Sequence, residues 1–166
     1  LEIGIGSGLN LSFYDPTRVS LIVGVDPAAA MHKLARQRAA QIRIPVEMIA
    51  LELDQIQAAD ASFDSIVCTF TLCTIPDAAT ALLEMRRVLK PGGKLLFSEH
   101  GLAPDLPVAR WQHRLTPLWK PFSGGCHLNR DIPALIRAGG FRIGQLDSSY
   151  LQGPRPMTWV WRGWAD

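Results

Sequence analysis

The stretch LEIGIGSGLN, residues 1–10, decides the fold of this chain. Its first three residues have the apolar character of a buried strand, and the glycines Gly4, Gly6 and Gly8 alternate directly after them. Glycine adopts positive φ readily and lets a ligand approach backbone N–H groups closely. At the carboxyl end of a strand, where open α/β sheets bind their ligands, this pattern predicts a ligand site rather than a plain tight turn.

Strand and helix patterns alternate along the rest of the chain. Apolar runs typical of strands lie at residues 21–26, 45–50, 62–70 and 94–99, and two closing strands are expected at 141–150 and 157–164. Helices are expected at 9–14, 27–41, 77–89 and 129–138, the last with Asn129 as its cap. The alternation predicts βαβ units around a parallel sheet, an α/β fold in one domain spanning residues 1–166.

Residues 102–128 interrupt this alternation with four prolines and several aromatic residues. We expect an insertion of helix fragments and loop on the substrate side of the fold. Its aromatic side chains, Trp111, Trp119 and Phe122, need burial and therefore argue against a linker.

Composition narrows the function classes. The 166 residues are 48% hydrophobic and 19% charged, and the net charge of +2 is too small to indicate a nucleic-acid groove or a membrane-surface patch. No apolar run approaches the ~20 residues of a membrane helix. The three cysteines form no CxxC motif, which predicts free thiols in a reducing cytoplasm and no metal site.

The spacing of the glycines selects the ligand. A dinucleotide fingerprint, GxGxxG, would need a third glycine where Leu9 stands, and no Gly-Lys-Ser/Thr of a phosphate-binding P-loop is present. Glu2, directly before the turn, would repel a pyrophosphate and suit a cationic ligand. Asp26, at the end of the second strand, is placed to accept hydrogen bonds from a ribose diol, to cap the helix expected from Pro27, or to do both.

Four blocks in this order resemble the class I S-adenosylmethionine-dependent methyltransferases that act on small molecules: LEIGIGSGLN, GVDPAAAM, DASFDSIVCTFTLCTIPD and EMRRVLKPGGKLLFSEH. Later blocks, SEHG, WQHRLTPLWKPFSGGCHLNRD, GFR and WRGWA, are similar to the alkyl-thiol methyltransferase branch of that family. The resemblance implies a Rossmann-like doubly wound sheet of seven mostly parallel strands with the last strand antiparallel. It also implies S-adenosylmethionine as cofactor and S-adenosylhomocysteine as product.

The family implies cofactor contacts at matching positions of this chain. Asp26 would bind both ribose hydroxyls, and Pro27 and Met31 would lie near the adenine. Glu52 would accept from the adenine amine and the Leu53 N–H would meet a ring nitrogen, although Leu51 stands where a glycine is common. The remaining implied contacts surround the methionine portion: Glu2, Gly4, Ile5, Gly6, Ser7, Gly8, Asn10 and Thr69.

Methyl transfer is an in-line displacement on an activated sulfonium, so the protein mainly aligns the nucleophile in an apolar, water-poor site. A base is needed only for a nucleophile that arrives protonated. His100, after the strand at 94–99, is the candidate base, unless it is hydrogen-bonded into the sheet edge. Cys73 and Thr74 stand where many relatives carry a His-His pair, and Cys73 is expected to be a small buried apolar residue.

Substrate contacts are expected from the insertion. His127 either lines the acceptor pocket or packs within its loop, and Trp111 and Trp119 either roof an apolar substrate or form a core for the insertion.

The reading that follows is a methyltransferase acting on a small apolar acceptor: a thiol, a quinone-type carbon or a lipid amine. Two alternatives stay open, a non-catalytic cofactor-binding module and an NAD-dependent reductase. The short first strand and the N-terminal helix of relatives also lead us to expect a missing N-terminal segment, which would be able to add membrane association to an otherwise cytoplasmic domain.

Overall fold

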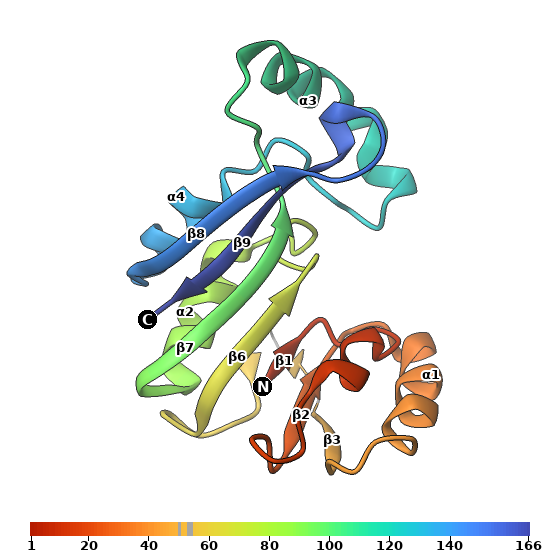
Figure 1. Cartoon of the computed structure of the whole chain (residues 1–166), viewed down its shortest axis with the longest axis vertical. Coiled ribbons are helices and arrows are strands. Elements are labelled where there is room, and N and C mark those ends of the chain that lie inside the picture. The colour runs from red at the N-terminus through yellow and green to blue at the C-terminus, as the bar shows by residue number, and fades with distance from the viewer. Residues whose placement is uncertain (50, 53–54) are drawn as a thin grey trace.

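The computed structural model describes residues 1–49, 51–52 and 55–166. Seven strands form one sheet in the order β3-β2-β1-β6-β7-β9-β8 (Figure 1). Neighbouring strands run parallel except β9, which is antiparallel to both β7 and β8. The expected doubly wound sheet with an antiparallel last strand is therefore confirmed. The strands are β1 (Glu2–Ile3), β2 (Ile22–Val25), β3 (Val46–Ile49), β6 (Phe63–Thr69), β7 (Leu89–His100), β8 (Ile143–Tyr150) and β9 (Trp159–Ala165), and β4 (Leu51–Glu52) pairs separately with β5 (Gln55–Ile56).

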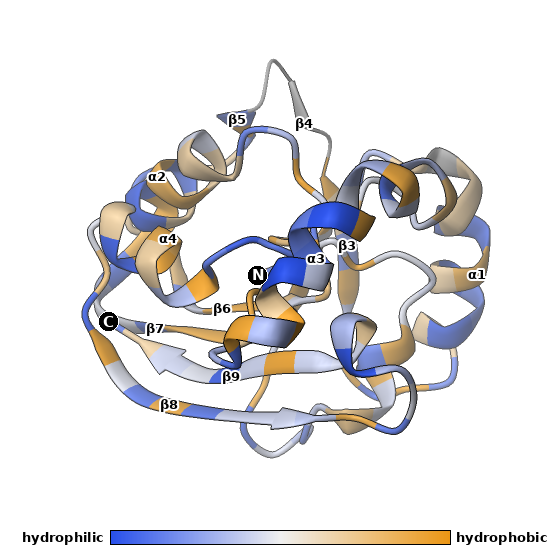
Figure 2. Ribbon diagram, turned by 90° about the horizontal axis from the view of Figure 1, so that it is seen from above, coloured by the Kyte–Doolittle hydropathy of each residue, from blue (hydrophilic) through white to orange (hydrophobic). Residues whose placement is uncertain are grey.

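Helices pack on this sheet through two hydrophobic cores. On one side of β6, β7, β9 and β8 lie α2 and α4 (Figure 2), whose buried side chains pack with Ile66 and Leu95. A second core joins Ile5, Leu11 and Ile22 at the other end of the sheet. The helices are α1 (Ala29–Ala39), α2 (Ala78–Val88), α3 (Leu106–Trp119) and α4 (Ile132–Ala138), with 3₁₀ turns η1 (Leu9–Phe13), η2 (Lys120–Phe122) and η3 (Arg155–Met157). Among the described residues, no helix combines the length and the apolarity that crossing a bilayer requires.

Helix starts differ from the sequence prediction at two places. The helix expected from residue 77 is α2, which the Asp77 carboxylate caps by accepting from the Thr80 N–H. However, α4 begins at Ile132 and is capped by Asp131 rather than by Asn129, whose side chain is paired with His113 instead. Likewise α1 starts at Ala29, two residues after the expected Pro27.

Residues 90–93, which lie between the helix and the strand expected from the sequence, are part of β7. Leu89 already pairs with Phe63, and the register then shifts so that Lys94 pairs with Ser65. The chain therefore bulges over Pro91, Gly92 and Gly93 without leaving the sheet, because both flanks keep their partner strand.

The insertion at 102–128 also differs from its prediction. Instead of helix fragments it holds one 14-residue helix, α3, which lies beyond the carboxyl end of β7 (Figure 1). Trp111 is 54% exposed and Phe122 90% exposed, so these two aromatics are not buried as expected from the sequence. The helix is attached through apolar contacts of Val108 and Trp119 and through the buried amide of Gln112, which accepts from the Ala103 N–H at 2.8 Å and donates to the carbonyls of Gly101 at 3.0 Å and Pro156 at 3.2 Å.

Candidate functional site

The glycine loop after β1 has a backbone that side chains would not tolerate. Gly4, Gly6 and Gly8 have φ of 71°, 53° and 78°. A Cβ on Gly4 would lie 2.1 Å from the Thr71 hydroxyl oxygen, whereas one on Gly6 would have no heavy atom closer than 3.8 Å. The loop is therefore closed at Gly4 by the β6–α2 segment and open at Gly6, where a ligand has room to approach.

Asp26 joins this loop to the end of β2. Its Oδ2 accepts from the Gly6 N–H at 2.8 Å, and its Oδ1 accepts from the Ala28 N–H at 2.7 Å. The carboxylate is half-buried. Each of its oxygens uses one lone pair in these bonds and keeps another for a further donor. Asp26 thus organises the turn before α1, although Ala28 rather than Asp26 precedes the first helical residue.

Below the loop lies a polar network around Glu2. Its side chain is fully buried and accepts from the Asn10 amide at 2.9 Å and from the Tyr14 hydroxyl at 3.0 Å. Asn10 also donates to the Thr69 hydroxyl at 3.2 Å. Burial raises the pKa of Glu2, and the bonds from Asn10 and Tyr14 oppose that rise. Three predicted cofactor residues, Glu2, Asn10 and Thr69, are therefore brought together as a support for the loop.

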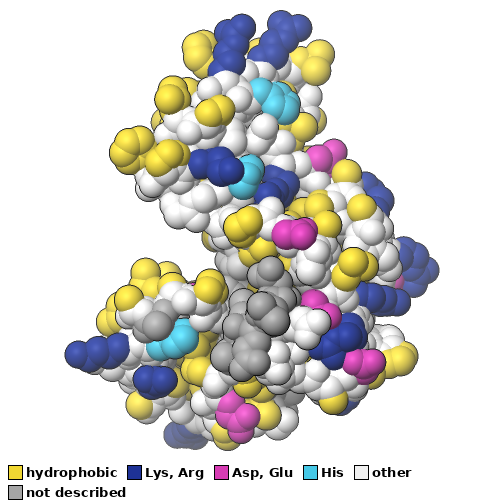
Figure 3. All heavy atoms as spheres, turned by 180° about the vertical axis from the view of Figure 1, so that it is seen from behind, with side chains coloured by type: hydrophobic (Ala, Val, Ile, Leu, Met, Phe, Trp, Pro, Cys, Tyr) yellow, Lys and Arg dark blue, Asp and Glu magenta, His cyan; other side chains and the backbone are white. Residues whose placement is uncertain are grey.

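A cavity of about 580 Å³ opens at the carboxyl ends of β1 and β2. Of the predicted cofactor residues, Gly4 and Pro27 line it. The other lining residues come mainly from the β6–α2 segment, from α2 and from the loop after η2: Ile3, Val25, Ile56, Thr71, Thr74, Ile75, Pro76, Asp77, Ala81, Glu84, Met85, Gly124 and Gly125. Seen from behind, the molecule is also deeply notched between the part that carries α3 and the part that carries α1 (Figure 3).

The other predicted cofactor residues lie around this site in different ways. Ile5 is buried in the second core, and the Ser7 carbonyl accepts from Arg38 of α1. Met31 is on α1, and its side chain is substantially exposed. Glu52 belongs to β4, and Leu53 lies outside the described residues.

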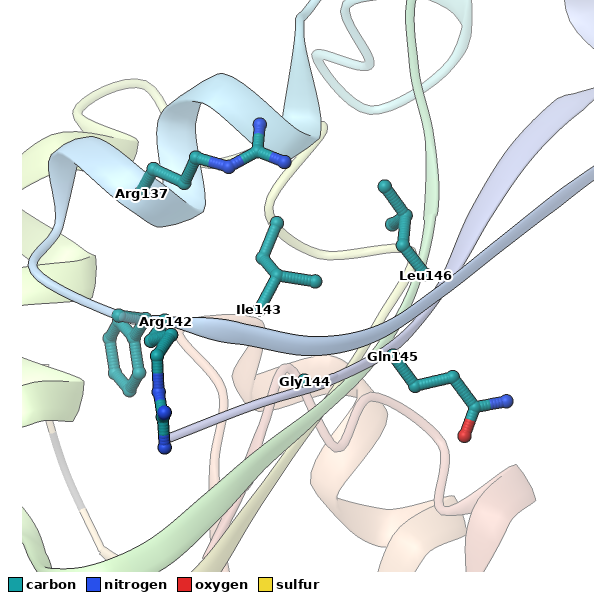
Figure 4. Close-up of a pocket in the computed structure, with 7 residues that line it drawn as sticks. Arg137, Arg142, Ile143, Gly144, Gln145 and Leu146 are labelled. Carbon is teal, nitrogen blue, oxygen red and sulfur yellow. The ribbon is translucent and has the colours of Figure 1, made fainter.

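A second depression of similar volume lies on the outer edge of the sheet, between α4 and the start of β8. Figure 4 shows Arg137 extending from α4 above Ile143 and Leu146, while Gln145 points to the opposite side. None of the predicted site residues lines it. We therefore place the candidate site at the glycine loop.

At the last residue of β7, His100 meets two cysteines that are distant in sequence. Its Nδ1 lies 3.7 Å from the Cys126 sulfur, and its ring contacts Phe70 edge-on with centroids 4.8 Å apart. Cys73 completes a group whose three ligand-type atoms all lie within 4.8 Å of one another. The proximity of the two thiols lowers the pKa of Cys126 and raises that of Cys73, and the nearby His100 lowers the pKa of Cys126 further.

Sequence reasoning missed this grouping and the residue that positions it, Glu99. The Glu99 carboxylate is fully buried and accepts from the backbone N–H groups of Thr71 at 2.9 Å and Cys73 at 3.1 Å. Burial raises its pKa. An acid at the end of an otherwise apolar strand, LLFSEH, was the one local signal for it.

The predicted substrate residues are divided by the structure. Trp119 packs against Cys73 and Cys126, and the His127 ring donates from Nδ1 to the Cys73 carbonyl at 3.1 Å, because a carbonyl oxygen only accepts. Burial, followed by the charge of Arg130, lowers the pKa of His127. Trp111, by contrast, is exposed on α3 with the Arg114 guanidinium 5.8 Å from its ring centre.

Comparisons with known proteins agree with this fold. The chain is 37% identical over 164 residues to the thiol S-methyltransferase TMT1B of Rattus norvegicus, a match that spans 96% of this chain and 65% of the relative. It is 30% identical over 111 residues to a phosphatidylethanolamine N-methyltransferase of Cereibacter sphaeroides, which covers 66% of this chain and 54% of that protein. A solved SAM-dependent methyltransferase from Methanosarcina mazei superposes with a TM-score of 0.75 at 21% identity, over 99% of this chain and 89% of that one.

The chain thus spans slightly less than two thirds of the length of its thiol S-methyltransferase relative from rat. A family model described as a methyltransferase domain matches residues 1–97, which include the glycine loop, Asp26 and most of β7. The chain belongs to this methyltransferase domain family.

Proposed function

We propose that this chain transfers the methyl group of S-adenosylmethionine to a small apolar thiol. The observation that carries the proposal is the contact between Asp26 and Gly6, which joins a carboxylate to an open glycine loop beside a cavity of about 580 Å³. Ligand pockets usually measure roughly 300–1,000 Å³. Membership of the methyltransferase family and the similarity to TMT1B support it.

The residues fit the cofactor in chemical terms. A ribose diol offers two donors, and the Asp26 carboxylate keeps acceptor capacity beyond its two backbone bonds. The open side of Gly6 leaves room for the methionine portion next to that carboxylate. On the adenine side, Pro27 lines the cavity, and Met31, Glu52 and Leu53 remain proposed contacts.

When bound, the cofactor would supply an activated methyl group. The buried network of Glu2, Asn10 and Thr69 would keep the loop rigid and so fix the cofactor's sulfur. Placing the acceptor behind the methyl carbon is the remaining task of the chain. Trp119 and His127, which lie beside the end of β7, are the proposed acceptor-side residues.

A thiol is the proposed acceptor because thiol S-methyltransferases match 96% of this chain, whereas the phosphatidylethanolamine enzyme matches 66%. A thiol must lose its proton before or during attack on the methyl carbon. His100 is the proposed catalytic residue for preparing the acceptor, since it follows the buried Glu99 at the end of β7. The buried free cysteines also suit a reducing compartment, so we propose the cytoplasm as the location.

Two measurements test the proposal. Thermal unfolding with S-adenosylhomocysteine or with NADH compares the cofactor classes, since a ligand at 100 times its Kd stabilises by about 2.7 kcal/mol. We expect stabilisation by S-adenosylhomocysteine only, and stabilisation by NADH alone would favour the reductase. Transfer of a labelled methyl group to a thiol, a phenol and an amine then identifies the acceptor. Cofactor binding without transfer to any of the three would favour a non-catalytic module.

A further inference from the structure

We propose that Cys73, His100 and Cys126 bind a zinc ion. The two sulfurs and the His100 Nδ1 already lie within 4.8 Å of one another, and the Nδ1–Cys126 distance is 3.7 Å. With Zn–S near 2.3 Å and Zn–N near 2.0–2.1 Å, a tetrahedral site separates a sulfur from a nitrogen by about 3.6 Å and two sulfurs by about 3.8 Å. The His100–Cys126 separation already fits, and the widest separation has to shrink by about 1 Å for the three side chains to ligate the ion.

The chemistry of the three ligands selects a soft divalent ion. Thiolate and imidazole ligands favour zinc over magnesium or calcium, which prefer oxygen. The neighbouring Glu99 does not compete, because its two oxygens accept from backbone N–H groups of Thr71 and Cys73. Two thiolates neutralise a divalent cation, so the buried site carries no net charge.

The surroundings hold the ligands in place. Cys73 is fixed on both sides of its peptide unit, with its N–H bonded to Glu99 at 3.1 Å and its carbonyl accepting from the backbone N–H of His127 at 2.8 Å. Arg130 donates to the carbonyls of Leu72 and Ile75 and so secures the segment that carries Cys73. Such outer contacts are what orient metal ligands in known sites.

The indole of Trp119 lies buried beside the proposed ligands. The indole Nε1 of Trp119 is buried and has no hydrogen-bond partner among the described residues, although Trp119 packs on Cys73 and Cys126. A buried N–H without an acceptor costs about 1–3 kcal/mol. A metal-bound thiolate at Cys126 would supply an acceptor that a neutral thiol supplies only weakly.

Three protein ligands leave one position open, as in catalytic zinc sites. Thr74 and Gly125, the neighbours of Cys73 and Cys126, line the cavity, which brings the site next to the proposed cofactor pocket. Resting on the proposed function, we assign the open position to the acceptor sulfur. Coordination releases the thiol proton to solvent. The thiolate then forms a bond to the methyl carbon as the sulfonium–carbon bond breaks, which leaves neutral S-adenosylhomocysteine. His100 thus acts as a ligand rather than as a base.

The test starts from the full chain, kept reduced with a phosphine and freed of metal. Zinc affinity is measured by competition with a chromogenic chelator, and cobalt substitution reports ligation through sulfur-to-metal charge-transfer absorption. We expect about one zinc ion per chain, and a loss of affinity of at least about tenfold in Cys73→Ala, His100→Gln and Cys126→Ala. The matched control is Cys68→Ala, which removes the third buried cysteine from the core beside β6 and should keep the metal.

Binding of S-adenosylhomocysteine to each variant shows that it is folded. The proposal is overturned if the reduced chain binds no zinc, or if Cys126→Ala binds zinc as tightly as the unmodified chain does. A disulfide between Cys73 and Cys126 that forms in preference to a metal site would overturn it as well. Adding a small alkyl thiol should increase the cobalt charge-transfer absorption, and an unchanged spectrum would refute the assignment of the open position. Full thiol methylation by metal-free protein would refute the zinc role while upholding the proposed function. Zinc binding without methylation of any thiol would refute the proposed function while upholding the zinc site.

Discussion

The carboxylate of Asp26 accepts a hydrogen bond from the Gly6 N–H at 2.8 Å, which joins the end of β2 to the loop that follows β1. Twenty residues separate the two in sequence, and the parallel pairing of β1 with β2 brings them together. The same carboxylate is the proposed partner of the cofactor's ribose.

Replacing Asp26 with alanine should weaken binding of S-adenosylhomocysteine by more than tenfold, or about 1.4 kcal/mol, because the ribose hydroxyls and the Gly6 N–H lose one acceptor together. Titration calorimetry measures the change. Asp147→Asn, an exposed acid on the edge strand β8, is the control and should bind as the unmodified chain does. Equal affinity of Asp26→Ala and the control would remove Asp26 from the cofactor site.

Gly4→Ala and Gly92→Ala form a matched pair, since the two glycines have φ of 71° and 77°. The left-handed backbone costs an alanine about 1–2 kcal/mol at either position. At Gly4 the new Cβ would also overlap Thr71, whereas at Gly92 nothing lies within 4 Å. We expect urea unfolding to show a further loss of about 1–3 kcal/mol for Gly4→Ala. The double variant Gly4→Ala with Thr71→Ala should recover part of it, and equal losses in the two single variants would contradict the overlap.

The buried Glu99 predicts a pH dependence of stability. Its pKa is raised in the folded chain, so the folded state binds more protons than the unfolded state once the pH exceeds the ordinary value of 4.5. The free energy of unfolding should therefore fall as the pH rises from 4.5 through the raised pKa, and Glu99→Gln should reduce this slope. Denaturant unfolding at a series of pH values measures it.

Glu84 contributes a pH dependence of stability whose sign is opposite to that of Glu99. Hydrogen bonds from Arg87 lower its pKa, so its contribution is present above 4.5 and is lost as the pH falls through the lowered pKa. Glu84→Gln should flatten the acid side of the profile and leave the slope above 4.5 unchanged. If Glu99→Gln has the slope of the unmodified chain above pH 4.5, the assignment to Glu99 is wrong.

Gln112→Leu should destabilise the attachment of α3. The leucine would leave the Ala103 N–H and the Gly101 carbonyl buried without partners, at about 1–3 kcal/mol for each group that water does not reach. Leu118→Ala on the same helix is the control, since Leu118 is 70% exposed and its loss should change stability by no more than about 0.5 kcal/mol. Thermal unfolding compares the two, and a Gln112→Leu variant as stable as Leu118→Ala would show that another contact holds the helix.

Local sequence patterns predict most strands of the sheet. The buried β2 was predicted because its side chains enter both hydrophobic cores, Ile22 one and Val25 the other, which produces a continuous apolar run. The sequence does not fix the first residue of every helix. Asn129 and Asp131 are both good caps by type, and only the pairing of Asn129 with His113 leaves the role to Asp131.

Burial in the insertion was not predictable from residue type. Trp111 is predicted either to roof a substrate or to form a core for the insertion, but it is exposed, and the helix that carries it is attached in part by the amide of Gln112. Two of the three backbone groups that this amide satisfies, Ala103 N–H and the Gly101 carbonyl, lie in the segment directly after β7, whereas the Pro156 carbonyl comes from η3, 44 residues away from Gln112.

The sequence by itself determined the parallel sheet, the glycine loop and the acid that follows β2, because each depends on residues only a few positions apart. Only the tertiary structure decided that Cys73, His100 and Cys126 meet, that Glu2 lies buried beneath the loop, and that Trp111 faces solvent. The contact between His100 and Cys126 spans 26 residues and depends on which strands become neighbours, and that order follows from the packing of the whole chain rather than from any local pattern.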